Sequence, residues 1–271
     1  MNRQNTDFGT RYGPWALVAG ASTGLGEEFA TQLAARGLHL VLIARRRELL
    51  DALGERLTHD FPIQVRTLQL DLASDDIGAM VAEATNDLDI GLLVYNAATS
   101  IIGPFFETPL QDHLNEIAVN VRAPLTLAYM LGTRMLKRQR GGIVLLSSLS
   151  SSQGSALIAN YTATKAYNRL LAEGLWEELR TRGIDVVACS PSAVSTPGYL
   201  ASAPRRAGRV SVSAMASREV VAEALAGLGK KPLVIPGWSN RLANVVMERV
   251  LPHRVAIRLM GRVMRGMYAR P

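Results

Sequence analysis

The sequence predicts an α/β fold, a single doubly wound domain with a mainly parallel sheet and helices on both faces. Short apolar runs alternate with helical patterns along the chain, and parallel strands need crossover helices between them. The 271 residues, 48% of them hydrophobic, suit one such domain. We divide the chain into a polar N-terminal arm (1–13), the α/β domain (14–236) and a C-terminal helical tail (237–271).

Each expected element begins or ends at a local signal. The first apolar run ends at Gly20, and Gly37 stops the first helix before the second run. Residues 197–216 lack periodicity and are expected to form a mobile loop or short helices beside the substrate. The expected strands are 15–19, 38–44, 64–70, 91–95, 142–147, 185–189 and 233–235, and the expected helices are 25–36, 47–59, 77–86, 110–138 and 160–182.

Composition excludes several classes of protein. No run reaches the roughly 18 apolar residues of a membrane-spanning helix. Cys189 is the single cysteine, so we expect no disulfide, no cysteine-based zinc site and a reducing compartment, the cytoplasm. The four histidines have no metal-ligand spacing, and no metal is expected. The polar start, residues 1–10, does not have the apolar core of a secretory signal.

The net charge of +7 is concentrated at the C-terminal end. Residues 230–271 hold nine of the 30 Lys and Arg residues but one of the 23 acids, Glu248. The rest of the chain is close to neutral, which does not support a nucleic-acid-binding face. If Pro252 begins a helix, Arg254, Arg258, Arg262 and Arg265 share one side and methionines the other. This basic amphipathic helix could touch a membrane peripherally, pack on a sister subunit or cap the substrate pocket.

A glycine-rich turn follows the first expected strand and opens a helix. Glycines let the backbone approach a pyrophosphate, whose charge is met by helix N–H groups. The turn also matches the Gly-x-Ser-x-Gly elbow of hydrolases, but that elbow needs a sheet before it and only about 14 residues precede this one. A P-loop is excluded because Gly-Lys-Ser/Thr is missing. The residues expected at the phosphates are Gly20, Ser22, Thr23, Gly24, Leu25 and Gly26.

The second expected strand ends in three arginines, Arg45, Arg46 and Arg47. A dinucleotide site needs a carboxylate there for a ribose 2′-hydroxyl or a cation for a 2′-phosphate. No acid is present, and arginine suits phosphate. Arg45 and Arg46 therefore predict NADP(H) rather than NAD(H).

Tyr161 and Lys165 lie four residues apart, on one face of an expected helix. A free tyrosine, with a pKa of about 10, is a poor proton donor or acceptor at neutral pH. A neighbouring ammonium favours the phenolate, so the spacing predicts a lowered tyrosine pKa and general acid–base catalysis.

Taken together, these motifs resemble the classical short-chain dehydrogenase/reductase family, with its Rossmann-type fold, from about Tyr12 to Thr196. Gly20, Gly24 and Gly26 match the family's Gly-x-x-x-Gly-x-Gly, and Tyr161 and Lys165 match its Tyr-x-x-x-Lys. The further matches are Ser148 (13 residues before the tyrosine), Asn120 in Val-Asn-Val, and Asp71 followed by Leu72 after the third strand.

The resemblance implies a division of roles. Tyr161 would donate or accept the proton of the substrate oxygen, and Ser148 would hydrogen-bond that oxygen. Lys165 would hold the nicotinamide ribose and tune the tyrosine, while Asn120 would position a water. The cofactor would also contact Asn96, Ala97, Pro191, Val194 and Thr196.

Two family motifs are altered in this chain. Asn-Asn-Ala-Gly is replaced by Tyr95-Asn96-Ala97-Ala98, and Pro-Gly by Pro191-Ser192. Both changes lie at the expected edges of the cofactor. They motivate an alternative function, a cofactor-binding regulatory or scaffold protein with little turnover.

The expected substrate walls are mainly apolar. They come from residues 99–106, 149–159 and 197–216, and predict a lipophilic ketone or secondary alcohol. Loop arginines Arg205, Arg206 and Arg209 could meet an acidic group. The two long helices imply a homodimer or homotetramer by the same resemblance. The apolar residues expected in the walls are Ile101, Ile102, Phe105, Phe106, Leu157 and Ile158.

Overall fold

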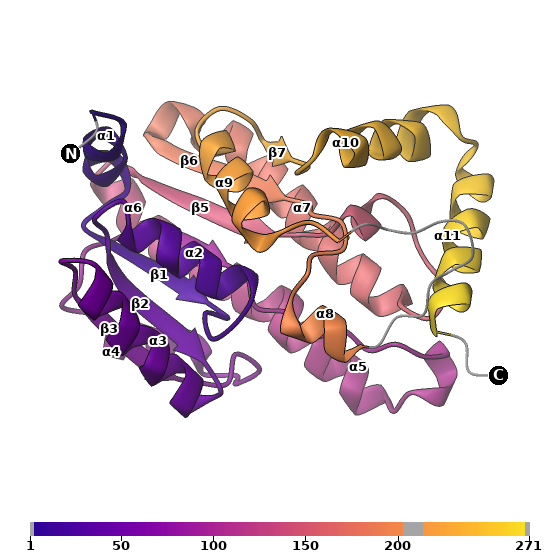
Figure 1. Ribbon diagram of the computed structural model, residues 1–271, viewed down its shortest axis with the longest axis horizontal. Coiled ribbons are helices and arrows are strands. Elements are labelled where there is room, and N and C mark those ends of the chain that lie inside the picture. Colours follow the sequence, from indigo (N-terminus) through magenta and orange to yellow (C-terminus); the bar gives the residue numbers. More distant parts are fainter. Residues whose placement is uncertain (1–2, 203–213, 269–271) are drawn as a thin grey trace.

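The computed structural model describes residues 3–202 and 214–268 and contains one seven-stranded parallel sheet (Figure 1). Strand order is β3-β2-β1-β4-β5-β6-β7, so the order reverses between β1 and β4. In doubly wound sheets, ligands bind at the carboxyl ends of the strands beside such a reversal. The strands are β1 (Trp15–Ala19), β2 (His39–Ala44), β3 (Val65–Gln69), β4 (Ile90–Tyr95), β5 (Gly141–Leu146), β6 (Ile184–Cys189) and β7 (Leu233–Val234).

Helices precede, connect and follow these strands. The α-helices are α1 (Arg3–Tyr12), α2 (Leu25–Ala34), α3 (Arg47–Asp60), α4 (Ile77–Ala84), α5 (Leu110–Ile117), α6 (Ala123–Lys137), α7 (Ala159–Leu179), α8 (Pro197–Ala201), α9 (Ser217–Gly227), α10 (Trp238–Val245) and α11 (His253–Tyr268). One face of the sheet is covered by α2, α3 and α9, and the other by α4, α6 and α7.

The core lies on both sides of the sheet because the strands are buried on both faces. In β1, Ala16 and Val18 pack in the layer of α2 and α9, while Leu17 packs in the layer of α6. The sequences of strands buried on both faces are continuous apolar runs, without an alternation of apolar and polar residues. The predicted single α/β domain with helices on both faces is confirmed.

The N-terminal segment expected as a polar arm includes a helix, α1, docked on the amino edge of the sheet. The carboxylate of Asp185, at the start of β6, accepts a hydrogen bond from Arg11 Nη2 at 2.8 Å and one from the Tyr12 hydroxyl at 2.7 Å. The Tyr12 ring is buried in the core. The sequence did not predict this helix because its contacts lie about 170 residues away in the chain.

Helix α9 was also not predicted, and the expected long helix 110–138 is interrupted. A π-helical turn at Ala118–Arg122 joins α5 to α6, and π-turns occur often at functional sites. Helix α8 begins the expected 197–216 loop, and Met215 forms a parallel bridge with Val194. Arg205, Arg206 and Arg209 lie outside the described residues.

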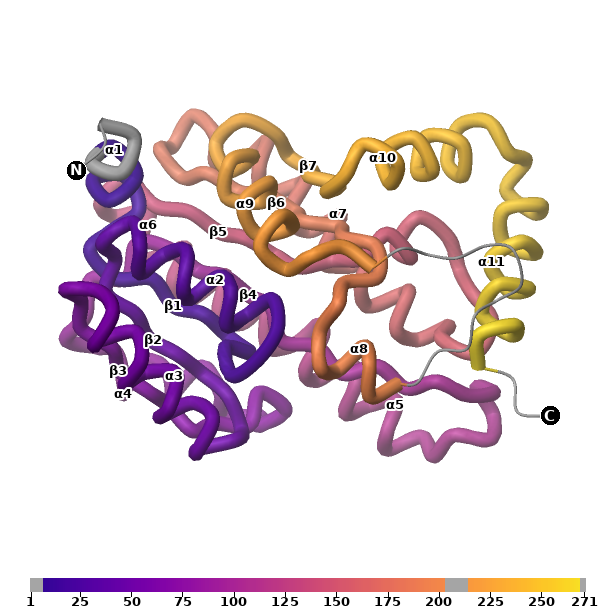
Figure 2. The backbone as a smooth tube through the Cα atoms, viewed as in Figure 1, coloured from indigo at the N-terminus to yellow at the C-terminus, as the bar shows by residue number. Residues whose placement is uncertain are grey.

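The C-terminal tail forms α10 and α11, which extend beyond the carboxyl ends of the strands (Figure 2). The N-terminal helix and α11 lie at opposite ends of the molecule. None of the helices within the described ranges is long and apolar enough to cross a membrane.

Candidate active site

A cavity of about 730 Å³ opens at the carboxyl ends of β1, β2, β4, β5 and β6. The reversal of strand order between β1 and β4 lies under this cavity. The sequence-predicted cofactor and catalytic residues line it, with the exceptions of Gly26 and Asn120, which stand behind its wall. The fold therefore gathers residues from positions 20 to 268 into one site.

The glycine-rich turn forms one end of the cavity. Gly24 has a φ of +64°, and a Cβ there would lie 2.9 Å from the Thr196 side chain on the opposite wall. A Cβ on Gly26 would overlap the carbonyl oxygen of Gly20. Only glycine permits these close approaches. The turn leads directly into the N-terminus of α2, where backbone N–H groups suit an anion.

Arginines rather than acids stand at the end of β2. Arg46 donates hydrogen bonds from Nη2 to the hydroxyls of Ser22 at 3.0 Å and Thr23 at 2.9 Å, while Arg45 also lines the cavity. Arg47 instead pairs with Asp51 at 2.7 Å and does not reach the cavity. Two exposed guanidinium groups thus face the space beside the glycine-rich turn.

Asp71 and Leu72 follow β3 on the same wall. The Asp71 carboxylate accepts a hydrogen bond from the Ala73 backbone N–H at 2.9 Å, and the Leu72 side chain is buried. This arrangement fixes the carboxylate at the cavity edge beside an apolar surface. It suits contact with a flat polar ring such as adenine.

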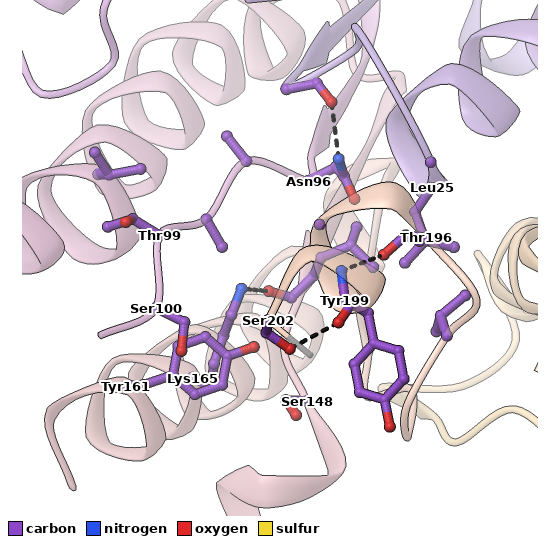
Figure 3. Close-up of a pocket in the computed structure, with 18 of the residues that line it drawn as sticks. Leu25, Asn96, Thr99, Ser100, Ser148, Tyr161, Lys165, Thr196, Tyr199 and Ser202 are labelled. Carbon is purple, nitrogen blue, oxygen red and sulfur yellow. Dashed lines mark hydrogen bonds between the residues drawn. The ribbon is translucent and has the colours of Figure 1, made fainter. Parts of the chain in front are cut away.

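After β4, Asn96 holds the glycine-rich turn through a hydrogen bond from Nδ2 to the Gly20 carbonyl at 2.9 Å (Figure 3). Tyr95 stands where the family has an asparagine. Its hydroxyl donates to the Val119 carbonyl at 2.5 Å, inside the π-helical turn. Tyr95 thus links the end of β4 to the helical layer that contains the π-helical turn. Ala97 and Ala98 line the cavity.

Tyr161, Lys165 and Ser148 converge at the centre of the cavity (Figure 3). The Ser148 hydroxyl accepts hydrogen bonds from the Ser150 N–H at 3.2 Å and from the Ser150 hydroxyl at 2.9 Å. The ammonium of Lys165 lies 5.8 Å from the centre of the Tyr161 ring and donates to the Leu146 carbonyl at 2.9 Å. Neighbouring Ser147 donates to the Lys165 carbonyl at 2.7 Å, so its hydroxyl faces the helix instead.

The predicted lowering of the tyrosine pKa is wrong for this structure. Burial raises the pKa of Tyr161 to about 12, while the neighbouring Ser148 hydroxyl acts to lower it. Burial also lowers the pKa of Lys165 to about 8. The sequence spacing indicated the neighbour but not the desolvation, which penalises both charged forms.

Asn120 lies in the π-helical turn and is fully buried. Its side chain accepts a hydrogen bond from the Thr99 N–H at 2.9 Å and donates to the Thr99 carbonyl at 2.8 Å. Nδ2 also donates to the Thr164 hydroxyl at 3.1 Å. Asn120 therefore ties the segment after β4 to α7, one residue before Lys165.

The wall after β6 is formed by Pro191, Val194 and Thr196. Thr196 caps α8, accepting a hydrogen bond at its hydroxyl from the Tyr199 N–H at 3.2 Å. Ser192, which replaces the family's glycine, keeps its hydroxyl buried with no hydrogen-bond partner in the described structure. A water or a polar group of a bound ligand would satisfy this hydroxyl.

The outer wall contains residues that sequence reasoning missed. Met264, Met267 and Tyr268 of α11 line the cavity, and the Tyr268 hydroxyl lies 3.1 Å from the hydroxyl of Ser202. The apolar side of the tail helix therefore caps the site, one of its three expected locations. Its amphipathic pattern showed an apolar face but not what that face covers.

The expected apolar wall is only partly correct. Ile102 and Ile158 line the cavity, whereas Phe106 is 97% exposed and Phe105 stacks on His113 outside it. No group of three or more His, Cys, Asp and Glu side chains in residues 3–202 and 214–268 could hold a metal.

Known proteins are similar to this chain in sequence and in fold. Residues 14–205 match the family described as short chain dehydrogenase. The chain is 31% identical over 235 residues to a 7beta-hydroxysteroid dehydrogenase of Clostridium sardiniense, covering 87% of this chain and 90% of that protein.

Two solved structures are similar across most of the chain. One, from a study of 7beta-hydroxysteroid dehydrogenase stereoselectivity, has a TM-score of 0.88 at 26% identity and covers 94% of this chain and 99% of its own. A short-chain dehydrogenase from Sphingobium yanoikuyae in complex with NADPH has a TM-score of 0.74 at 31% identity, covering 86% and 92%. On motifs, fold and sequence, the chain belongs to the short chain dehydrogenase family and is an oxidoreductase of that family.

Proposed function

We propose that the protein is an NADP(H)-dependent oxidoreductase that interconverts a carbonyl and a secondary alcohol on a lipophilic substrate. The observation that carries the proposal is the convergence of Tyr161, Ser148 and Lys165 in one cavity whose far end is lined by Arg45 and Arg46. The similar NADPH-bound dehydrogenase supports the choice of cofactor.

The residues present fit a dinucleotide phosphate. The glycine-rich turn packs so closely on its neighbours that a Cβ at Gly20, Gly24 or Gly26 would clash with protein atoms, and it leads into the N-terminus of α2. Arg45 and Arg46 would hold the 2′-phosphate, Asp71 the adenine and Ser192 or Val194 the nicotinamide amide. When bound, NADP(H) supplies or accepts the hydride.

The protein's own residues would handle the proton and the developing charge. In reduction, Tyr161 donates its phenolic proton to the carbonyl oxygen, and in oxidation it accepts the hydroxyl proton. Ser148, which lines the same cavity, donates to the same oxygen and stabilises its charge. The Lys165 ammonium would stabilise the phenolate left after proton transfer, and Asn120 would keep the wall at Thr99 in register.

The substrate we propose is a hydroxysteroid or its ketone. Ile102, Ile158 and the two methionines of α11 offer apolar contact, and Tyr199 and Tyr268 place phenol groups at the outer end. A rigid polycyclic alcohol with a distant polar group suits such a lining. The 7beta-hydroxysteroid dehydrogenase relatives support this class.

A cofactor titration and a carbonyl panel test the function. Purified protein is titrated with NADPH and NADH and then assayed with 7-oxo steroids, 3-oxoacyl thioesters and small aldehydes. We expect tighter binding of NADPH and the highest kcat/KM on the steroid. Binding without turnover on the whole panel would support the regulatory alternative instead.

We also propose that the protein forms a homodimer or tetramer through the outer faces of α6 and α7. Large apolar side chains are exposed there in the single chain: Tyr129 is 77% exposed and Leu170 is 65% exposed. Exposed apolar faces of this kind are typical of subunit contacts. A second copy of the chain would bury them by symmetry.

A further inference from the structure

One buried carboxylate beside the catalytic groups has no part in the mechanism described above. Glu116 of α5 is 0% exposed and lies one helical turn before Asn120. Glutamate is rarely buried to this extent unless it is partnered. The site therefore contains a charged group whose presence needs an explanation.

Both carboxylate oxygens of Glu116 accept hydrogen bonds from N–H donors. The backbone N–H of Ile101 donates to Oε1 at 3.1 Å, and Nδ2 of Asn160 donates to Oε2 at 2.6 Å. A neutral carboxyl would have to direct its proton toward one of these donors or away from both. The geometry thus satisfies the ionised form, although burial raises the pKa of Glu116.

The two partners belong to different parts of the fold, the segment after β4 and the first turn of α7. Ile101 lies in the segment after β4, in which the backbone of Thr99 is hydrogen-bonded to the Asn120 side chain. Asn160 directly precedes Tyr161 and also donates to the carbonyl of His113 at 3.1 Å. Glu116 therefore connects the substrate wall to the first turn of α7.

The charge of Glu116 acts on both titrating groups of the site. It raises the pKa of Tyr161 by repelling the phenolate, and it raises the pKa of Lys165 by attracting the ammonium. His113, on the preceding turn of α5, is the remaining titratable group whose charge acts on Glu116. The carboxylate thus counteracts the desolvation of the buried ammonium.

We propose that Glu116 is a positioning residue that acts as the buried counter-ion of the catalytic pair, keeping Lys165 protonated and setting the pH range over which Tyr161 transfers its proton. This inference rests on the proposed function, since it assigns Tyr161 the proton transfer. No substrate or cofactor contact is required of Glu116.

The pH profile of kcat/KM for alcohol oxidation at saturating NADP tests the proposal. In Glu116→Gln, loss of the negative charge lowers the pKa of both Tyr161 and Lys165, so both limbs move to lower pH by about one unit. Glu116→Asp keeps the charge and is expected to stay nearer the wild-type profile at a reduced rate. Glu107→Gln, at an exposed glutamate of the same region, is the matched control and leaves the profile unchanged.

Three results distinguish the counter-ion role of Glu116 from a merely structural role and from failure of the proposed function. A Glu116→Gln enzyme that loses rate while both limbs keep their wild-type positions contradicts the counter-ion role and leaves a structural one. If that variant does not fold, ¹³C NMR of labelled glutamate in the wild type decides, because a protonated Glu116 at pH 7 would overturn the proposal. If Tyr161→Phe keeps wild-type turnover, it is the proposed function that fails, whereas an inactive Tyr161→Phe with an unshifted Glu116→Gln refutes the counter-ion role alone.

Discussion

The arginines at one end of the cavity and the catalytic residues at the other differ in how much of their role the sequence predicts. The arginines after β2 and the four-residue spacing of Tyr161 and Lys165 are visible in the sequence because local geometry fixes them. The pKa values are not, since they depend on burial by residues distant in the chain. Glu116 escaped notice for the same reason: its partners Ile101 and Asn160 lie in other elements.

Arginine substitutions test cofactor choice. Arg45→Ala and Arg46→Ala should each weaken NADPH binding by about 10- to 100-fold, since a charge-assisted contact contributes about 1.5–3 kcal/mol. NADH binding should change little because it has no 2′-phosphate. Isothermal titration gives both dissociation constants.

Arg47→Ala is the matched control for this experiment. Arg47 pairs with Asp51 and does not line the cavity, so its loss should leave NADPH binding unchanged. Equal affinities of the three variants and the wild type for NADPH would refute the assignment of the phosphate site.

At the scale of elements, the strands and central helices followed the sequence closely, and the differences lie where tertiary contact decides. The expected helix 110–138 contains a π-helical turn at Asn120, and the tail pattern predicted α11 but not its place over the cavity. An amphipathic pattern shows that a face is buried, not against what. Ala256, Gly261 and Met264 of α11 are buried, whereas Val255, Ile257 and Leu259 of the same helix stay exposed beside its arginines.

Removing a methionine of α11 tests its role as a cap. Met264→Ala takes away apolar contact worth about 1.5–3 kcal/mol at full burial, so KM for a bulky ketone should rise about tenfold or more. The dissociation constant of NADPH should stay unchanged. Arg262→Ala, on the exposed side of the same helix, should leave KM unaltered. Similar KM values in both variants would place the substrate elsewhere.

At the scale of the whole molecule, the sequence predicts the sheet and its two helical layers but not the overall shape. Alternating apolar runs sufficed for the parallel sheet and both helical layers. Helix α1 docks through Arg11, Tyr12 and Asp185. This contact joins distant parts of the chain, so no local sequence pattern predicts it. Subunit assembly likewise depends on exposed faces rather than on periodicity.

Light scattering tests the proposed assembly. The wild type should have at least twice the 29.3 kDa chain mass, whereas Leu170→Glu, which places a charge on the outer face of α7, should be monomeric. Leu242→Glu makes the same change at a 58% exposed leucine of α10 and should keep the wild-type mass. A monomeric wild type, or equal masses for both variants, would contradict assembly through α6 and α7.

The central claim is that Tyr161 transfers the proton in an NADP(H)-dependent carbonyl reduction, and single-turnover kinetics of Tyr161→Phe test it most directly. With NADPH and a 7-oxo steroid, loss of the phenolic proton should slow hydride transfer by about 10²- to 10⁴-fold. NADPH affinity should stay within a few-fold of the wild type. Hydride transfer at the wild-type rate in Tyr161→Phe would contradict the account.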